Sequence, residues 1–308
     1  MARTSLVAIG VGVALATAAC TNASAETPRA DQSQATASAA SAGPIASSEA
    51  VVKLVPGTLK AKGSISFAMD ASYAPFEYFD TDNTTIIGFD ADLSQAIAAK
   101  MGLTAKDVNT GFDTILVGLA SGKHDVGMSA FSATPERAKA VDFVVYAAGG
   151  SGIAVKQGNP KQLSMEPVKL CGHTISAQKG SIQGIDYLPK FSKQCTDAGK
   201  PAIDIALYPS QNEANLAVAS GRADAVLADS VSMAYQASQS KGAFELAPGP
   251  DFDPTNIAVA LPNDSNLVPA VSQALKELAS EGVVTRLAAK WGIPEQVIKQ
   301  ASIGEVIR

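Results

Sequence analysis

Charged and hydroxyl side chains occupy the segment Ser129–Arg137, where a predicted strand passes into a predicted helix. Thr134 is a residue type that caps helix N-termini, and Pro135 is favoured at the first helical position. Free backbone N–H groups at such a terminus favour an anion. Ser132 adds a hydroxyl, and Arg137 can form a bidentate pair with a carboxylate. The segment is a candidate carboxylate site, although a capped helix with a surface arginine is the simpler interpretation of this local pattern alone.

Two further segments have the same form. Gln178–Ser181 ends a predicted strand, where Gly180 permits close backbone approach and Ser181 opens the next helix. Ala225–Asp229 is an apolar strand that ends in a carboxylate able to accept hydrogen bonds from an ammonium ion. Taken singly, the first is equally a plain turn, and Asp229 is more simply the cap of the following helix.

Strands and helices alternate along the chain and would position these segments. The predicted strands are Ser64–Met69, Asp125–Ala130, Ile153–Lys156, Thr174–Gln178, Ile203–Tyr208, Ala225–Asp229 and Asn256–Leu261. The predicted helices are Asp90–Met101, Phe112–Ala120, Ser181–Lys193, Gln211–Ser220, Ser230–Ser240, Leu267–Ser280 and Val283–Lys290. This alternation favours an α/β fold with mainly parallel sheets. Ligands of such folds bind where strands end and helices begin.

Composition narrows the class of protein. The chain has 308 residues, of which 46% are hydrophobic, so it can bury a sizeable core. Its formal net charge is -5, with 24 basic and 29 acidic residues and no basic run. Nucleic acid is therefore excluded as an expected partner.

The N-terminus is typical of an exported protein. An uncharged apolar run, Ser5–Ala19, follows Arg3 and is too short to span a bilayer, so residues 1–19 are predicted to be a signal peptide. The small residues before Cys20 resemble a bacterial lipobox, which implies lipidation of Cys20 and a membrane-anchored lipoprotein. Cleavage after Ala25, giving a freely secreted protein, is the alternative. Residues 20–54 are rich in Ala, Ser and Thr and are predicted to form a disordered tether.

The two remaining cysteines, Cys171 and Cys195, are expected to pair in an oxidising compartment. The loop closed by this disulfide is worth roughly 3 kcal/mol in the chain-entropy model. A metal site that includes His173 is a weak alternative, because the spacing matches no zinc signature. His173 and His124 lie in polar, turn-like segments and are predicted to be surface residues. No metal or cofactor is expected.

The ordered series of motifs resembles the family-3 extracellular solute-binding proteins, the polar amino acid receptors of ABC importers. The resemblance spans about Ser64 to Gly292. It rests on these segments: Asp70–Tyr78, Gly88–Leu93, Phe112–Ile115, Gly122–Gly127, Thr134–Arg137, Val141–Phe143, Gln178–Ser181, Gly221–Ala225, Gly282 and Lys290–Gly292. Each motif alone is weak, and the order in which they occur makes the resemblance specific.

The resemblance implies a two-lobed periplasmic-binding-protein-like fold of type II, with a ligand cleft between two α/β lobes. Residues 55–148 and 258–308 would form lobe 1, and residues 149–257 would form lobe 2. Two crossover strands, near Ala147–Gly152 and Thr255–Ala258, would join the lobes. The protein would be a monomeric binding component that captures a free amino acid, closes around it and delivers it to ABC permease subunits, without catalysing a reaction.

The resemblance also assigns site residues. Arg137, Ser132 and the backbone at Ala130 would hold the α-carboxylate of the ligand. Asp229, with Ser129 or the Ala130 carbonyl, would hold the α-ammonium. Around the rest of the ligand would lie Tyr73 and Phe112 against its aliphatic part, and Asp70, Gln178, Ser181 and Ile182 around its side chain.

The identity of the ligand and two rival functions stay open at this stage. A polar neutral or basic amino acid is favoured, because no second cationic group is assigned to the cleft. A dehydratase of the prephenate or arogenate type has used this fold and would need a cleft carboxylic acid, for which Glu77 or Asp70 could be nominated. A ligand-sensing module that reports to a receptor is the other alternative.

Overall fold

The computed structural model describes residues 45–308. The predicted signal peptide, Cys20, the alternative cleavage site after Ala25 and most of the predicted tether lie outside these residues. Within 45–308, none of the helices combines the length and the apolar character that a membrane span requires.

Ten strands form one hydrogen-bonded sheet in the order β5-β1-β6-β12-β7-β10-β8-β9, with β11 and β13 also paired to β7. Their bounds are β1 Ser64–Met69, β5 Thr104–Asn109, β6 Val126–Ser132, β7 Val141–Lys156, β8 Thr174–Gln178, β9 Asp204–Tyr208, β10 Ala225–Asp229, β11 Phe244–Leu246, β12 Phe252–Pro262 and β13 Val306–Ile307. A small second sheet contains β2 Ser72–Tyr73, β3 Glu77–Phe79 and β4 Ile86–Ile87.

Helices cover the large sheet. Those of the first half are α1 Glu49–Leu54, α2 Gly57–Lys62, α3 Phe89–Lys100, α4 Phe112–Ala120 and α5 Pro135–Ala138. Those of the second half are η1 Pro167–Lys169, the π-helical turn η2 Gln183–Tyr187, α6 Leu188–Asp197, α7 Gln211–Ala219, α8 Ser230–Gln239, α9 Val268–Ser280, α10 Val283–Lys290 and α11 Glu295–Lys299. The alternation predicted from the sequence is confirmed, with β7 far longer than the predicted Ile153–Lys156.

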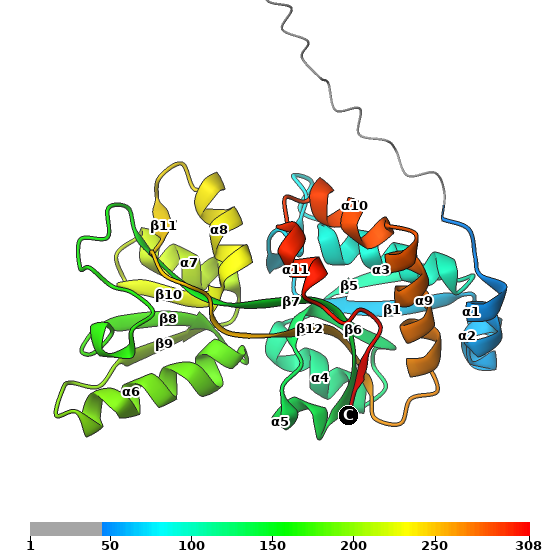
Figure 1. Cartoon of the computed structure of the whole chain (residues 1–308), viewed down its shortest axis with the longest axis horizontal. Helices are drawn as coiled ribbons and strands as arrows, with labels where there is room; N and C mark the ends of the chain where they lie inside the picture. The colour runs from blue at the N-terminus through cyan, green and yellow to red at the C-terminus, as the bar shows by residue number, and fades with distance from the viewer. Residues whose placement is uncertain (1–44) are drawn as a thin grey trace, which may run out of the picture. The chain divides into compact units, whose positions relative to one another are not determined.

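Two long antiparallel strands, β7 and β12, run between the two lobes (Figure 1). The first part of β7, Val141–Gly149, pairs with β12, and the part that begins at Ser151 pairs with β10. Lobe 1 is here the part built on β5, β1, β6, β13 and the adjoining ends of β7 and β12. Lobe 2 is the part built on β10, β8, β9 and β11. The expected α/β fold of two lobes joined by two crossover strands is therefore present.

Alternate residues of each strand face opposite sides of the sheet, and each lobe has a core on both sides. In lobe 1, Phe67 and Val144 pack in one core with α3 and α9, whereas Ala68 and Phe143 pack in the other with α4. Lobe 2 has the same pattern, with a core against α6 on one side and a core against α7 and α8 on the other. Both lobes therefore have cores of their own.

The predicted disulfide is present. Cys171 follows η1 and Cys195 lies in α6, and their Cα atoms are 5.5 Å apart. Because Cys171 is oxidised, it cannot act as a thiolate ligand. Residues 45–308 contain no group of three or more His, Cys, Asp or Glu side chains that could hold a metal ion. His173 is half-buried beside Asp224, 3.1 Å from its carboxylate. The surface prediction for His124 is wrong: it is 5% exposed, because α4 packs over it.

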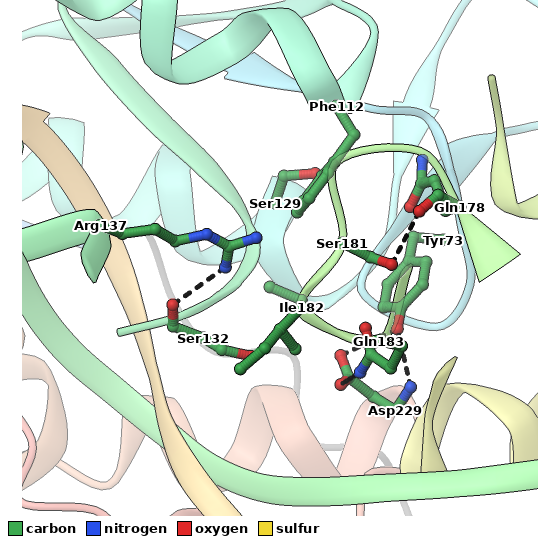
Figure 2. A pocket seen from close by; sticks show the side chains of 11 residues that line it. Tyr73, Phe112, Ser129, Ser132, Arg137, Gln178, Ser181, Ile182, Gln183 and Asp229 are labelled. Atoms are coloured by element: carbon green, nitrogen blue, oxygen red, sulfur yellow. Dashed lines mark hydrogen bonds between the residues drawn. The ribbon is translucent and has the colours of Figure 1, made fainter. Parts of the chain in front are cut away.

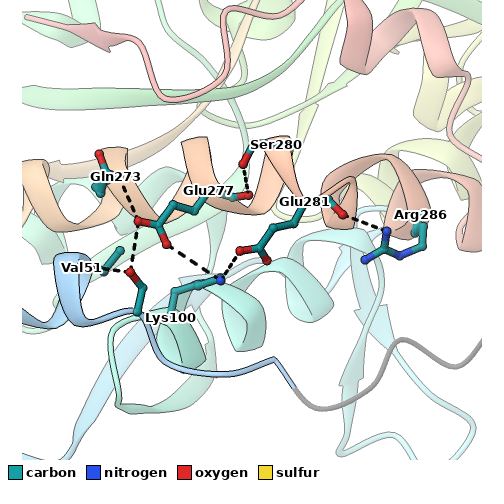
Figure 3. A network of polar contacts seen from close by, with 8 residues as sticks. Val51, Lys100, Gln273, Glu277, Ser280, Glu281 and Arg286 are labelled. Atoms are coloured by element: carbon teal, nitrogen blue, oxygen red, sulfur yellow. Dashed lines mark hydrogen bonds and ion pairs between the residues drawn. The ribbon is translucent and has the colours of Figure 1, made fainter.

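The predicted tether ends earlier than the sequence suggests. Ser48 caps α1, and Val51 of this helix is buried in lobe 1, so residues 49–54 are folded. Figure 3 shows the polar network that holds this segment. Ser48 donates to Glu277 of α9 at 3.1 Å, and Lys100 of α3 lies between Glu277 and Glu281, 2.5 Å from the latter. Composition missed this helix because its polar anchors lie far away in the chain.

Candidate functional site between the two lobes

Arg137 contributes a half-buried cation from lobe 1. Thr134 accepts a hydrogen bond from the Arg137 backbone N–H at 3.3 Å and Pro135 occupies the first position of α5, as the sequence predicts. The helix is only one turn long, so the guanidinium itself is the main anion-binding group here. Burial lowers the pKa of Arg137 to about 10, and the side chain remains charged at neutral pH.

The guanidinium is held by its surroundings. Arg137 donates to the Ser132 carbonyl at 3.0 Å and to the Gly180 carbonyl of lobe 2 at 2.9 Å. Its Cζ lies 5.7 Å from the ring centroids of both Phe112 and Phe131, which stack on each other. A cation over two aromatic rings is electrostatically favoured. The surface-arginine interpretation is therefore wrong.

Asp229 contributes the opposite charge from the end of β10 in lobe 2. Its carboxylate accepts hydrogen bonds from Tyr73 Oη and Gln183 Nε2, both at 2.8 Å. It makes no side-chain hydrogen bond to cap α8, so the capping interpretation is wrong. Burial raises the pKa of Asp229 to about 6, against the lowering effect of its hydrogen bonds and of Arg137. The carboxylate is ionised at neutral pH.

The end of β6 supplies three more groups from lobe 1. Ser129 and Ser132 are buried, and Ala130 has a φ of 45°, in the left-handed region that non-glycine residues rarely adopt. Its backbone N–H donates to the buried carboxylate of Asp90 at 3.0 Å, which holds this conformation. Strain of this kind persists where the surroundings impose it, and such positions cluster at functional sites.

The turn after β8 brings lobe 2 against lobe 1. Gly180 has a φ of 82°, and a Cβ there would lie 2.9 Å from the Cα of Asp113. Glycine is therefore required by both the conformation and the close approach. Ser181 donates to the Gln178 carbonyl at 2.7 Å, and Gln178 donates through its side chain to Asp70 of lobe 1 at 3.0 Å.

These groups meet around one cavity, shown in Figure 2. It is lined by Tyr73, Phe112, Ser129, Ala130, Ser132, Arg137, Gln178, Ser181, Ile182, Gln183 and Asp229. All the ligand-binding residues proposed from the sequence except Asp70 are in this set. The cavity has a volume of about 10 Å³, enough for roughly one water. The lobes are thus closed on each other, and entry of a larger molecule requires them to separate.

Asp70 lies behind the lining side chains. It accepts hydrogen bonds from Ser72 Oγ at 2.6 Å, the Phe112 backbone N–H at 2.9 Å and Gln178 Nε2. Burial raises its pKa above the ordinary range. Gln178, which does line the cavity, holds Asp70 in this closed arrangement, and the assignment of Asp70 to the ligand side chain stays a prediction. Glu77 is also absent from the lining and is fully buried against Ser129.

Gln183 is the lining residue that sequence reasoning missed. Besides its bond to Asp229, it donates to Ser151 of β7 at 2.9 Å. Gln183 directly follows Ser181 and Ile182, and this position could have indicated that it also lines the cavity. The sequence predicted a regular α-helix here, whereas the chain forms the π-helical turn η2, which changes the direction of the side chains.

Curated relatives and solved structures resemble the chain over both lobes. The chain is 32% identical over 252 residues to the arginine-binding protein ArgT of Corynebacterium glutamicum, covering 82% of each chain. Its structure matches an ancestral arginine-binding protein bound to arginine with a TM-score of 0.68 and 29% identity, covering 74% of this chain and 98% of the other. It also matches the ancestral amino acid-binding protein AncCDT-1, a precursor of cyclohexadienyl dehydratase, with a TM-score of 0.65 and 30% identity, covering 76% and 97%.

The family model for bacterial extracellular solute-binding proteins, family 3, matches residues 65–294. This range contains lobe 2, most of lobe 1 and every residue that lines the cavity. The chain therefore belongs to family 3 of the bacterial extracellular solute-binding proteins.

Proposed function

We propose that the protein captures a free basic amino acid, with arginine as the first candidate, outside the cytoplasm and delivers it to an ABC importer in the membrane. The observation that carries this proposal is the pair of opposite charges, Arg137 from lobe 1 and Asp229 from lobe 2, on one cavity. A zwitterionic amino acid presents a carboxylate and an ammonium on the same carbon. One ligand can therefore bind both lobes and stabilise their closed arrangement.

In this proposal Arg137 and Ser132 bind the carboxylate, while Asp229 and Ser129 bind the ammonium. Tyr73 and Phe112 lie against the aliphatic part of the ligand. The side-chain end is lined by Gln178, which can offer an amide oxygen to a guanidinium. If Gln178 turns away from Asp70, that buried carboxylate becomes available to a cationic side chain. Arg137 is the only cationic side chain among the lining residues, so an acidic amino acid has no second cation to bind.

The relatives support the choice of arginine. ArgT is named for arginine binding, and the ancestral arginine-binding protein was solved with arginine bound. Both match this chain over nearly the whole region that contains the lobes. The same comparison supports binding without turnover, although the AncCDT-1 match shows that the fold has a route to a dehydratase. Neither Glu77 nor Asp70, the candidates for acid catalysis, lines the cavity.

Calorimetric titration of residues 45–308 with the twenty amino acids tests the proposal. Arginine should bind tightly, and Arg137→Ala should weaken binding by about 2–5 kcal/mol, or roughly 30- to several-thousand-fold. Lys139→Ala is the matched control and should leave the affinity unchanged. Lys139 is an exposed cation close to Arg137 in the chain, and it forms an ion pair with Glu136. Absence of binding by every amino acid would refute the proposal.

Agmatine, which is arginine without its carboxylate, separates the two ends of the site. It should bind wild-type protein as weakly as arginine binds Arg137→Ala, and the variant should bind both compounds alike. The same protein samples should also be incubated with cyclohexadienyl acids, and these compounds should be recovered unreacted. Loss of water from such an acid would support the dehydratase instead.

Lobe closure and membrane attachment are further parts of the proposal. Small-angle scattering should show a smaller radius of gyration with arginine than without it, and equal radii would refute ligand-driven closure.

We propose residues 20–44 as a tether and Cys20 as its lipid anchor. Mass spectrometry of the mature N-terminus would show a lipidated Cys20, or a terminus after Ala25 if the chain is freely secreted. Copurification with permease subunits would separate an importer component from a sensor.

A further inference from the structure

Two buried carboxyl groups lie directly behind the cavity. Glu77 opens β3 and Asp90 lies in the first turn of α3, and both side chains are fully buried. Backbone hydrogen bonds from Phe89 to Pro75 and from Asp90 to Phe76 hold the two segments together. Because Glu77 then bonds to Ser129 and Asp90 bonds to the next residue, Ala130, the two carboxyl groups lie beside each other, close enough to interact.

Each carboxyl group uses one oxygen to hold a cavity residue. Glu77 Oε1 accepts from the Ser129 hydroxyl at 2.5 Å. Asp90 Oδ2 accepts from the Ala130 backbone N–H at 3.0 Å and from Tyr146 Oη at 2.7 Å. The other two oxygens, Glu77 Oε2 and Asp90 Oδ1, are the only buried side-chain polar atoms within residues 45–308 that have no hydrogen-bond donor.

One proton accounts for both of these unpartnered oxygens. Two ionised carboxylates have only acceptors to offer, and they repel each other strongly when buried. If Glu77 is protonated, its Oε2–H can donate to Asp90 Oδ1, and every oxygen of the pair then has a partner. Neither group forms an ion pair in the described part of the chain, so no cation offers another solution.

The titratable groups around the pair favour this proton. Asp70 after β1 and Tyr73 of β2 lie near enough to Glu77 to interact with its charge, as Asp107 of β5 does with Asp90, and Tyr146 of β7 bonds to Asp90 directly; all four are acids. Burial, followed by the charge of Asp90, raises the pKa of Glu77 well above its ordinary value. Burial raises the pKa of Asp90 to about 6, so Asp90 is the ionised member at neutral pH.

We propose that Glu77 and Asp90 share one proton and act as positioning residues that make Ser129 and Ala130 acceptors for the ammonium group of the ligand. The Ser129 hydroxyl has a single proton, which goes to Glu77, and its oxygen already accepts from the Asp70 backbone N–H at 3.1 Å. Toward the cavity, Ser129 can then offer only a lone pair. The Ala130 N–H is committed to Asp90, which leaves its carbonyl for a ligand. The ammonium assignment rests on the proposed function, whereas the shared proton does not.

Infrared spectroscopy of the ligand-free protein in D2O tests the shared proton without any ligand. Wild-type protein at pH 7 should show the carbonyl band of a protonated carboxylic acid, and Glu77→Gln should lack it. Asp125→Asn is the control, because Asp125 is a partly buried carboxylate of the same lobe, bonded to Ser66 and Lys62 and not in contact with the pair. It should leave the band unchanged. Absence of the band from wild-type protein at pH 7 would overturn the proposal.

Substitutions test the positioning role. The amide side chain in Glu77→Gln can accept from Ser129 and donate to Asp90, so arginine affinity should change by no more than about threefold. In Glu77→Ala the Ser129 proton is free to turn toward the cavity, and affinity should fall about tenfold or more. Equal affinities for these two variants would overturn the positioning role.

The double variant Glu77→Gln with Asp90→Asn sharpens this test. The amide introduced by Asp90→Asn must use its oxygen for Ala130 and Tyr146, so its NH2 group faces the NH2 group of the amide introduced by Glu77→Gln. The clash is relieved if the amide introduced by Glu77→Gln rotates so that its NH2 group donates to the Ser129 oxygen. The Ser129 hydroxyl proton then points into the cavity. Affinity should be about tenfold lower than in Glu77→Gln alone, and an unchanged affinity would argue against the role. If wild-type protein binds no amino acid, the infrared result still decides the shared proton.

Discussion

The two lobes hold their cavity residues in different ways. In lobe 1, Ser129 donates to Glu77 and the Ala130 N–H donates to Asp90, both within the same lobe. Arg137 likewise donates to the Ser132 carbonyl of its own lobe. Most of the lobe 1 half of the site is therefore held in place whatever lobe 2 does.

In lobe 2, two of the functional side chains bond across to the other lobe. Asp229 accepts from Tyr73 of lobe 1, and Gln178 donates to Asp70 of lobe 1. Gln183 is the partner that Asp229 has within its own lobe. We therefore expect a ligand to meet a preformed half-site on lobe 1, which lobe 2 completes when the lobes close.

Removal of the lobe 2 charge should have the largest effect. Asp229→Asn should weaken arginine binding by about 2–5 kcal/mol, because the ligand ammonium loses its buried charge partner. If lobe 1 is the preformed half, the dissociation rate should rise while the association rate changes little. Stopped-flow binding measures both rates, with exposed Asp251→Asn as the control. A loss that appears mainly in the association rate would break the comparison.

The pH profile of binding should follow Asp229. Its pKa is raised to about 6, so the proton is retained on this carboxyl up to that pH. Because an ammonium group binds the ionised form, affinity should be full above pH 7 and should fall as the pH drops through 6. The limiting slope is about tenfold per pH unit for one proton. Calorimetry at several pH values checks this, and Asp229→Asn should flatten the profile. A constant affinity between pH 7 and pH 5 would contradict it.

Gly180→Ala tests the close approach of the lobes. The added Cβ would lie 2.9 Å from the Cα of Asp113, so the closed state should be disfavoured and affinity should fall about tenfold. Gly221→Ala is the matched control, because its φ is 77° and the space around it is open. Both variants should lose about 1 kcal/mol of unfolding free energy through backbone strain. Only Gly180→Ala should lose affinity, and equal affinities would show that the contact does not govern closure.

The ion pair between Lys179 and Asp113 should have the smallest effect on arginine affinity. It joins the lobes at 2.8 Å, but the Lys179 side chain is 62% exposed. An exposed pair contributes about 0–1 kcal/mol and is screened by salt. Lys179→Ala should weaken arginine binding by less than about fivefold in low salt, and by less still at high ionic strength. A larger, salt-independent loss would mean that lobe 2 contributes a specific contact at this rim.

Local sequence determined much of this protein. The capping residue Thr134, the helix-starting Pro135 and the strand ending in Asp229 are short-range patterns, and their strand or helix assignments agree with the structure. The order of the motifs also indicated the family and most of the cavity residues. These features could be predicted because backbone propensity and hydrophobic period act over a few residues.

Only the tertiary structure decided which partners those residues have. Asp70 is bonded to Gln178, 108 positions away, and Tyr73 reaches Asp229 across 156 positions. The burial of His124 and the pairing of Glu77 with Asp90 are equally invisible to local patterns. A side chain's charge state, hydrogen-bond direction and access to a ligand depend on groups that packing brings together from distant parts of the chain. The sequence therefore determined which chemical groups end each strand, and packing of the two lobes decided which of them face the cavity.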